Sequence, residues 1–206
     1  MFKKFIGILL LSSLSAGVLA TSAQADAAKP GQSMTHMKTE KGISSTLEAA
    51  GIVLYVQGGA TAAVMGDSIS SADAQVVFHI PITGTKTGVE HVGSNVAIFN
   101  TTNNSQVLIK NPVIDLKKAV VNAVIPQVGT QPVALFTITN AKDLKAKVTN
   151  DRKAKLRTTT YDGVKLSLAP GVAATLVTAL GLPAGALPEA LAFASASVSL
   201  YSPIKK

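Results

Sequence analysis

The sequence predicts an all-β, antiparallel, β-sandwich-like domain with two short helices. Apolar and polar residues alternate in many short segments, turn-forming residues separate most of these segments, and only two stretches have helical features. Because the short strands follow one another without intervening helices, a parallel sheet built from β-α-β units is not expected.

The first 25 residues have the order of a secretory signal peptide. Lys3 and Lys4 form a basic start, residues 5–14 are mostly apolar, and Ala23-Gln24-Ala25 is a small-x-small cleavage site. The apolar run is too short to span a bilayer. We therefore expect cleavage after Ala25 and a secreted, extracellular protein whose mature chain has no transmembrane segment and which either diffuses freely or associates with the cell wall.

The start of the mature chain shows no periodicity. Residues 26–41 include Pro30 and Gly31 and are otherwise mostly polar or small, which predicts a flexible leader before a single β-rich domain over 42–206. Ser45-Thr46-Leu47-Glu48 has the form of a capping box, and Gly51 is placed to end a helix. These two features predict the first helix over Ser45 to Ala50.

Eight segments with strand character follow. In the first of them, Phe78, Ile80 and Ile82 share one face and His79 lies on the other. Turn residues such as Asn103-Asn104 and Asn111-Pro112 separate neighbouring segments. The predicted strands are 76–82, 95–99, 106–110, 113–116, 119–125, 133–139, 164–168 and 194–201.

The second helix is predicted between the last two of these strands, over Pro170 to Leu180. Proline is tolerated in the first turn of a helix, and Val172, Leu176 and Leu180 form a stripe at i, i+4 and i+8. Gly181 is placed to close the helix.

Composition limits the chemistry that is available. The chain has no cysteine, so it has neither a disulfide nor a thiolate metal site, and it has no tryptophan, so we expect a core of Val, Ile, Leu and Ala. It has three histidines, no Gly-x-Ser-x-Gly motif and scattered carboxylates, which predicts a protein that is not an enzyme. Met34-Thr35-His36-Met37 is either a soft-metal site, for example for copper, or an ordinary part of the leader. We favour the leader and expect no metal site.

The formal net charge of +8 favours contact with anionic surfaces. Basic residues concentrate between 142 and 157, where no aromatic side chain is available for base stacking before Tyr161, so a nucleic acid is not the expected partner. This segment is either a solvated loop or exposed edge, or a contact site for an anionic cell-wall polymer. Its basic residues are Lys142, Lys145, Lys147, Arg152, Lys153, Lys155 and Arg157.

Several phrases of the sequence resemble a known family. Asn111-Pro112-Val113-Ile114-Asp115 follows an alternating segment, Pro132-Val133-Ala134-Leu135-Phe136 comes about one hairpin later, and Gly163-Val164-Lys165-Leu166-Ser167-Leu168 leads into the second helix. In order and spacing these phrases resemble the HtaA family of secreted haem-transport domains of actinobacteria. The resemblance extends roughly from Ile43 to Tyr201 and indicates a divergent member.

The resemblance implies a β-rich domain that binds haem for iron acquisition and passes it to a membrane transporter. The family uses a tyrosine as axial ligand and a histidine hydrogen-bonded to it. Tyr55-Val56-Gln57-Gly58 is similar to the Tyr-Val-x-Gly phrase of the family, which makes Tyr55 the candidate ligand, although a half-buried strand aromatic would show the same pattern. The family pattern places the histidine after the strand that ends here at Phe99, where this chain has Asn100-Thr101-Thr102-Asn103-Asn104. His91 or His79 is the alternative partner.

Overall fold

The computed structural model describes residues 32–66, 68 and 71–204. The predicted signal peptide and residues 26–31 of the predicted leader lie outside the described residues. Neither helix within the described ranges is long and apolar enough to cross a bilayer.

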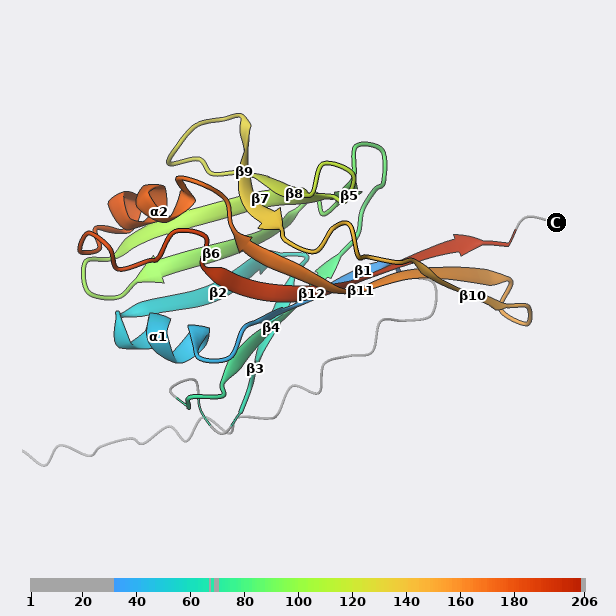
Figure 1. Cartoon of the computed structure of the whole chain (residues 1–206), viewed down its shortest axis with the longest axis horizontal. Helices are drawn as coiled ribbons and strands as arrows, with labels where there is room; N and C mark the ends of the chain where they lie inside the picture. Colours follow the sequence, from blue (N-terminus) through green and yellow to red (C-terminus); the bar gives the residue numbers. More distant parts are fainter. Residues whose placement is uncertain (1–31, 67, 69–70, 205–206) are drawn as a thin grey trace, which may run out of the picture.

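The described residues form one antiparallel sheet of twelve strands with two short helices, which confirms the predicted all-β class (Figure 1). The strand order is β2-β6-β7-β8-β9-β11-β12-β1-β4-β3, with β10 paired to β11 and β5 paired to β7. The strands are β1 Met34–Thr39, β2 Ile52–Gly58, β3 Thr61–Met65, β4 Gln75–Pro81, β5 Val89–Glu90, β6 Ser94–Asn100, β7 Ser105–Asp115, β8 Val120–Val124, β9 Pro132–Ile138, β10 Lys147–Asp151, β11 Leu156–Leu168 and β12 Ala192–Pro203.

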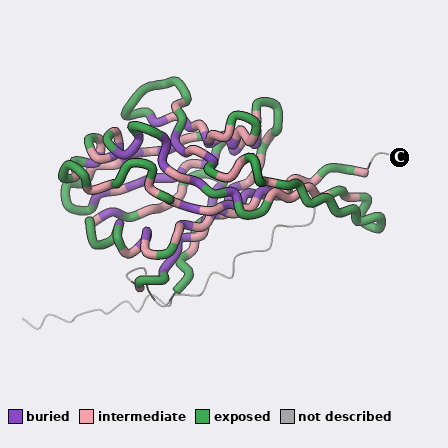
Figure 2. Tube along the Cα trace, in the orientation of Figure 1, coloured by how far each residue is buried: buried purple, intermediate pink, exposed green. Residues whose placement is uncertain are grey.

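The sheet curls so that one of its faces encloses the core. Buried aliphatic side chains from β4, β6, β7, β8, β9, β11 and β12 form one cluster (Figure 2). β12 shows the pattern most simply, because Ala194, Ala196 and Val198 are buried while Ser195 and Ser197 between them are half-buried. The period-two alternation read from the sequence therefore identifies the inner face correctly.

The long strands β11 and β12 extend beyond this core. Their outer halves pair with each other, and β10 pairs with the start of β11. The result is an arm that projects from the end of the molecule opposite the two helices (Figure 1). Every residue of β10 is exposed (Figure 2).

The predicted flexible leader is wrong for residues 34–39. These residues form β1, which lies inside the sheet between β12 and β4, with Met37 opposite Ala196 on one side and Phe78 on the other. Thr35, Met37 and Thr39 are buried. The alternation of apolar and polar residues is not visible in the sequence of this strand, because two inward positions are threonines. Their hydroxyls form hydrogen bonds with buried polar groups.

The first helix, α1, spans Ile43–Ala49 and begins two residues earlier than predicted. Ser45 does not cap it: the residue before the helix is Gly42, and the Ser45 hydroxyl donates to the Gly42 carbonyl. Ile43 and Leu47 are buried one turn apart, so apolar packing rather than a capping side chain determines where this helix starts.

The second helix, α2, spans Val172–Leu180 and lies against β7. Its predicted stripe of Val172, Leu176 and Leu180 is buried, and Gly181 ends the helix in the left-handed conformation, as predicted. The helix begins after Pro170, with Gly171 as the preceding residue.

Asn111-Pro112, predicted as a turn between two strands, lies instead within the single long strand β7. The pairing of β7 with β8 shifts between Lys110 and Val113, and Asn111 has a φ of 49°. This is a β-bulge, which bends the strand without ending it.

Candidate binding site

The interior of the described part of the chain contains a small apolar cavity next to His91. It is lined by side chains from most strands, including Met37, Leu54, Phe136 and Phe193, and has a volume of about 50 Å³. Small-molecule sites usually measure about 300–1,000 Å³. The interior is therefore a packed core with room for a few atoms and does not accommodate a porphyrin.

His91 lies at the wall of this cavity and is almost completely buried. Its Nδ1 is 2.9 Å from the Pro112 carbonyl oxygen, and its Nε2 is 2.8 Å from the Thr35 hydroxyl. Because a carbonyl only accepts, Nδ1 carries the proton and Nε2 accepts from Thr35. Burial lowers the pKa of His91, and the hydrogen bond to Pro112 opposes this effect. Both ring nitrogens are thus engaged in holding the fold together.

Tyr55 lies on β2, opposite Ala97 of β6. Its neighbour Leu54 lines the internal cavity, so alternation directs the Tyr55 side chain to the outer face of the sheet. No hydrogen bond among the described residues joins Tyr55 to a histidine. The structure therefore does not bring Tyr55 and the inward-facing His91 together.

His79 has a different partner from the one expected. It lies on β4 directly opposite His36 of β1, and their Nδ1 atoms are 2.7 Å apart. Burial lowers the pKa of His36, and the proximity of His79 lowers it further. The sequence indicated no such pair, because His36 was assigned to the leader.

A larger groove, which we call the outer groove, opens at the edge of the core between three segments that are distant in the sequence. These segments are the loop 85–89, the end of β7 with the turn after it, and the adjacent strands β11 and β12. Its volume is about 420 Å³. Its residues on β11 and β12 lie on the core-facing side of the sheet, because Tyr161 is opposite the buried Val198. The lining residues are Thr85, Lys86, Thr87, Gly88, Val89, Ile114, Asp115, Leu116, Lys117, Lys118, Tyr161 and Leu200.

The groove combines an apolar wall with positive charge. Val89, Ile114, Leu116 and Leu200 line its apolar part, and its lining also holds three lysines and the carboxylate of Asp115. That carboxylate accepts the backbone N–H groups of Lys117 and Lys118 in the turn and lies 3.7 Å from the Lys118 ammonium. A second carboxylate, that of Glu90, lies beside the groove and accepts two hydrogen bonds from Thr87. The groove thus keeps a positive excess.

Tyr161 is the one aromatic side chain that lines this groove. It is half-buried, and no hydrogen bond within the described ranges involves its hydroxyl. Sequence reasoning noted this residue only as the first aromatic after the basic segment. The groove was missed because strand pairing, and no local motif, brings residues 86, 117 and 161 together.

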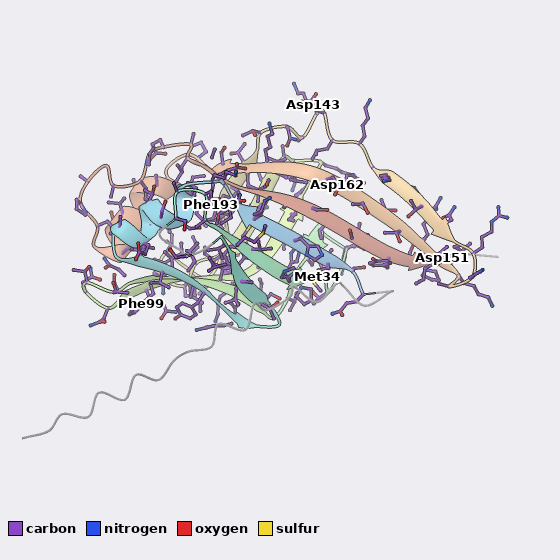
Figure 3. The ribbon with its side chains drawn as sticks, turned by 90° about the horizontal axis from the view of Figure 1, so that it is seen from below. Met34, Phe99, Asp143, Asp151, Asp162 and Phe193 are labelled. Atoms are coloured by element: carbon purple, nitrogen blue, oxygen red, sulfur yellow. The ribbon has the colours of Figure 1, made fainter. Side chains whose placement is uncertain are left out.

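The basic segment 142–157 runs from the loop before β10 through β10 to the first residues of β11. In the β10–β11 hairpin, Asn150 pairs with Arg157, and the Asp151 carboxylate accepts two backbone N–H groups of the turn. Figure 3 places Asp151 at the far end of the arm and Asp143 on the loop before it. All seven basic residues are exposed. The ion pair recorded in the described ranges is Lys118–Asp115, so these seven cations are unpaired.

No protein-family description matches the chain, and no curated protein matches it. Its structure is similar to the crystal structure of the C-terminal domain of HtaA from Corynebacterium glutamicum, with a TM-score of 0.38 and 10% sequence identity. The matched region covers 82% of this chain and 98% of that domain. That domain belongs to the family whose phrases the sequence resembles. At this level of similarity, no ligand and no residue role passes from that domain to this chain.

Proposed function

We propose that this protein is a secreted, non-enzymatic binding protein that takes haem into the outer groove, with Tyr161 facing the iron. The observation that carries the proposal is the chemistry of the groove, which joins a free phenol, an apolar wall and three lysines in a space of about 420 Å³. The family resemblance of the sequence supplies the ligand class.

The residues of the groove suit haem in three respects. Haem is a large apolar ring, and the groove offers the half-buried side chains of Leu116 and Leu200 for contact with it. Its two carboxylates match the lysine ammonium groups. When bound, haem supplies an iron that a tyrosine phenolate can ligate.

Tyr55 is the alternative ligand. The Tyr-Val-x-Gly phrase favours it, and its side chain lies on the outer face of β2. It lines neither the internal cavity nor the outer groove. Haem at Tyr55 would rest on an open sheet face without a neighbouring imidazole, whereas haem at Tyr161 would enter a formed groove.

Hemin titration followed by absorbance separates the two tyrosines. We expect one hemin per chain, a Soret band and a tyrosinate charge-transfer band that disappears in Tyr161→Phe and persists in Tyr55→Phe. Replacing Lys86 and Lys118 by glutamine should weaken binding, while Lys38→Gln, outside the groove, should leave it unchanged. Loss of the band only in Tyr55→Phe would move the site to β2, and the absence of stoichiometric binding would end the haem proposal.

The arm supports a second function, contact with an anionic polymer of the cell wall. Five of the seven unpaired cations lie on the exposed arm and present a positive surface that stands away from the rest of the molecule: Lys147, Arg152, Lys153, Lys155 and Arg157. The Debye length is about 10 Å at 0.1 M salt, so added salt screens the charges and must weaken such contact.

Retention on purified cell walls tests this function. We expect retention to fall steeply between low and physiological salt, and to fall similarly when Arg152, Lys153 and Lys155 are replaced by glutamine. A matched control replaces Lys38, Lys110 and Lys165, which lie outside the arm. Equal effects of the two triple variants would show that retention depends on the net charge of the protein and not on the position of the charges in the arm.

A further inference from the structure

Neither of the two proposed functions involves the pair formed by His36 and His79. The two residues are directly opposite on the adjacent strands β1 and β4. Their Nδ1 atoms are 2.7 Å apart, and their rings meet edge-on at 85° with centroids 4.7 Å apart. Both imidazoles therefore direct the same type of nitrogen at one point in space.

That point lies on the outer face of the sheet. Thr35 and Met37, on either side of His36, face the core. Alternation therefore places His36 on the outside, between His79 and Ser197 of β12. Figure 3 shows β1 between its two neighbours, with Met34 near its start.

A carboxylate lies two strands away from His36 across the sheet. The Ser197 hydroxyl, opposite His36 on β12, donates to the Asp162 carboxylate at 2.5 Å. Asp162 lies in the bulge of β11. The two imidazoles are thus followed across the sheet by a hydroxyl and then by a negative charge.

The separation of the two nitrogens matches one metal geometry better than another. An imidazole nitrogen lies about 2.0–2.1 Å from a bound first-row metal. Two such nitrogens at right angles are about 2.8–3.0 Å apart, and at a tetrahedral angle about 3.3–3.4 Å apart. The observed 2.7 Å is the length of the hydrogen bond in the metal-free pair; it is nearer to the separation in a square-planar ion, so the strands would have to move apart less for that geometry than for a tetrahedral one.

The ring nitrogens of the pair also bear on metal binding. Metal ions bind imidazole through a nitrogen that carries no proton. The Nε2 of His79 is buried without a hydrogen-bond partner. The two Nδ1 atoms share one hydrogen bond, so a metal ion would have to displace the proton between them, and the unpartnered Nε2 of His79 is the nitrogen that could take it up.

We propose that His36 and His79 form a cross-strand site for a divalent copper ion, with their two Nδ1 atoms as protein ligands and water at the remaining positions. Within the described part of the chain, no three His, Cys, Asp or Glu side chains gather around one point, so water completes the coordination. Copper is the ion for which imidazole sites of this geometry have the highest affinity among divalent first-row metals. The site does not depend on haem binding.

Titration of the metal-free protein with copper sulfate, followed by electron paramagnetic resonance, tests this site. We expect one Cu²⁺ per chain with a tetragonal spectrum and hyperfine structure from two imidazole nitrogens. His36→Gln and His79→Gln should each lower the affinity about tenfold or more. Lys38→Gln, two residues along the same face, should not change it. Zn²⁺ should bind more weakly than Cu²⁺.

Unchanged binding in both histidine variants would place the copper elsewhere, for example at the chain's amino terminus, and would overturn the proposal. Equal affinity for Zn²⁺ would overturn the assignment of a square-planar ion. A measurement on the unmodified chain guards against misfolded variants: Cu²⁺ should broaden the imidazole NMR signals of His36 and His79 before those of buried His91. Broadening of all three signals together would also count against the site.

Discussion

The imidazole of His91 and the hydroxyl of Thr35 are joined by a 2.8 Å hydrogen bond inside the core, although 56 residues separate them in the chain. The contact fastens β1 to the segment between β5 and β6. Because the Pro112 carbonyl fixes the proton on Nδ1, the Nε2 of His91 has to accept a hydrogen bond, and Thr35 supplies it. This relationship makes the first strand part of the core.

Removal of the Thr35 hydroxyl should destabilise the protein. Thr35→Val keeps the shape of the side chain and leaves the Nε2 of His91 buried without a partner. An unsatisfied buried polar group costs about 1–3 kcal/mol, so the free energy of unfolding in urea should fall by that amount. Thr61→Val, at an exposed position of β3, is the control and should change it little. Equal stabilities of the two variants would contradict the assigned role of the bond.

Acidification should also destabilise the fold. The folded-state pKa of His91 lies below the ordinary value of 6.5, so the unfolded chain binds more protons below that pH. The contribution of neutral His91 to the free energy of unfolding is therefore complete above about pH 6.5 and is lost as the pH falls toward the folded-state pKa. One proton corresponds to a slope of up to about 1.4 kcal/mol per pH unit.

Urea unfolding measured between pH 7 and 5 checks this dependence. His36 acts in the same direction, because its pKa is also lowered. In His91→Gln the slope should become shallower. A slope that does not change in this variant would show that other groups carry the pH dependence.

Deleting β1 should abolish folding. A chain that starts at Gly42 lacks the strand between β12 and β4 and exposes both of their edges. We expect it to show no cooperative thermal transition, whereas a chain that starts at Gln32 should unfold like the mature protein. Cooperative unfolding of both chains at the same temperature would restore the idea of a dispensable leader.

Two glycines with similar backbone angles should differ in their tolerance of a side chain. Gly58 has a φ of 74°, and an added Cβ would collide with the Gly93 carbonyl oxygen. Gly93 has a φ of 82°, and an added Cβ would meet nothing within 4 Å. Gly93→Ala should cost about 1 kcal/mol for backbone strain, and Gly58→Ala clearly more, as measured by urea unfolding. Similar losses in both variants would contradict the close approach at Gly58.

The elements that could be predicted are those whose side chains alternate without interruption. β4 and β12 bury every second residue over most of their length, so their positions follow from the sequence alone. The strands that were missed are β1, β2, β3, β5 and β10. β1 and β10 are rich in polar residues and β5 has two residues, whereas β2 and β3 lack a regular alternation of apolar and polar residues. β1 buries threonines, and β10 buries nothing because it forms part of an exposed arm. In such strands the pairing partners, and not the composition, determine the structure.

The candidate sites were harder to predict for the same reason. Tyr55 was identified from a local phrase, but a phrase does not show what lies across the sheet from it. Lys86, Lys117 and Tyr161 meet only after β5, β7 and β11 are in place. The pairing of His36 with His79 likewise depends on the register of β1 against β4. Contacts of this kind become visible only when the topology is known.

The most direct measurement of the central claim is a crystal structure of the protein grown with an equimolar amount of hemin. The account predicts haem in the groove beside Leu116 and Leu200, with the Tyr161 oxygen on the iron and the carboxylates near Lys86, Lys117 or Lys118. Haem on the outer face of β2 at Tyr55, or a groove without haem at full hemin occupancy in solution, would contradict it.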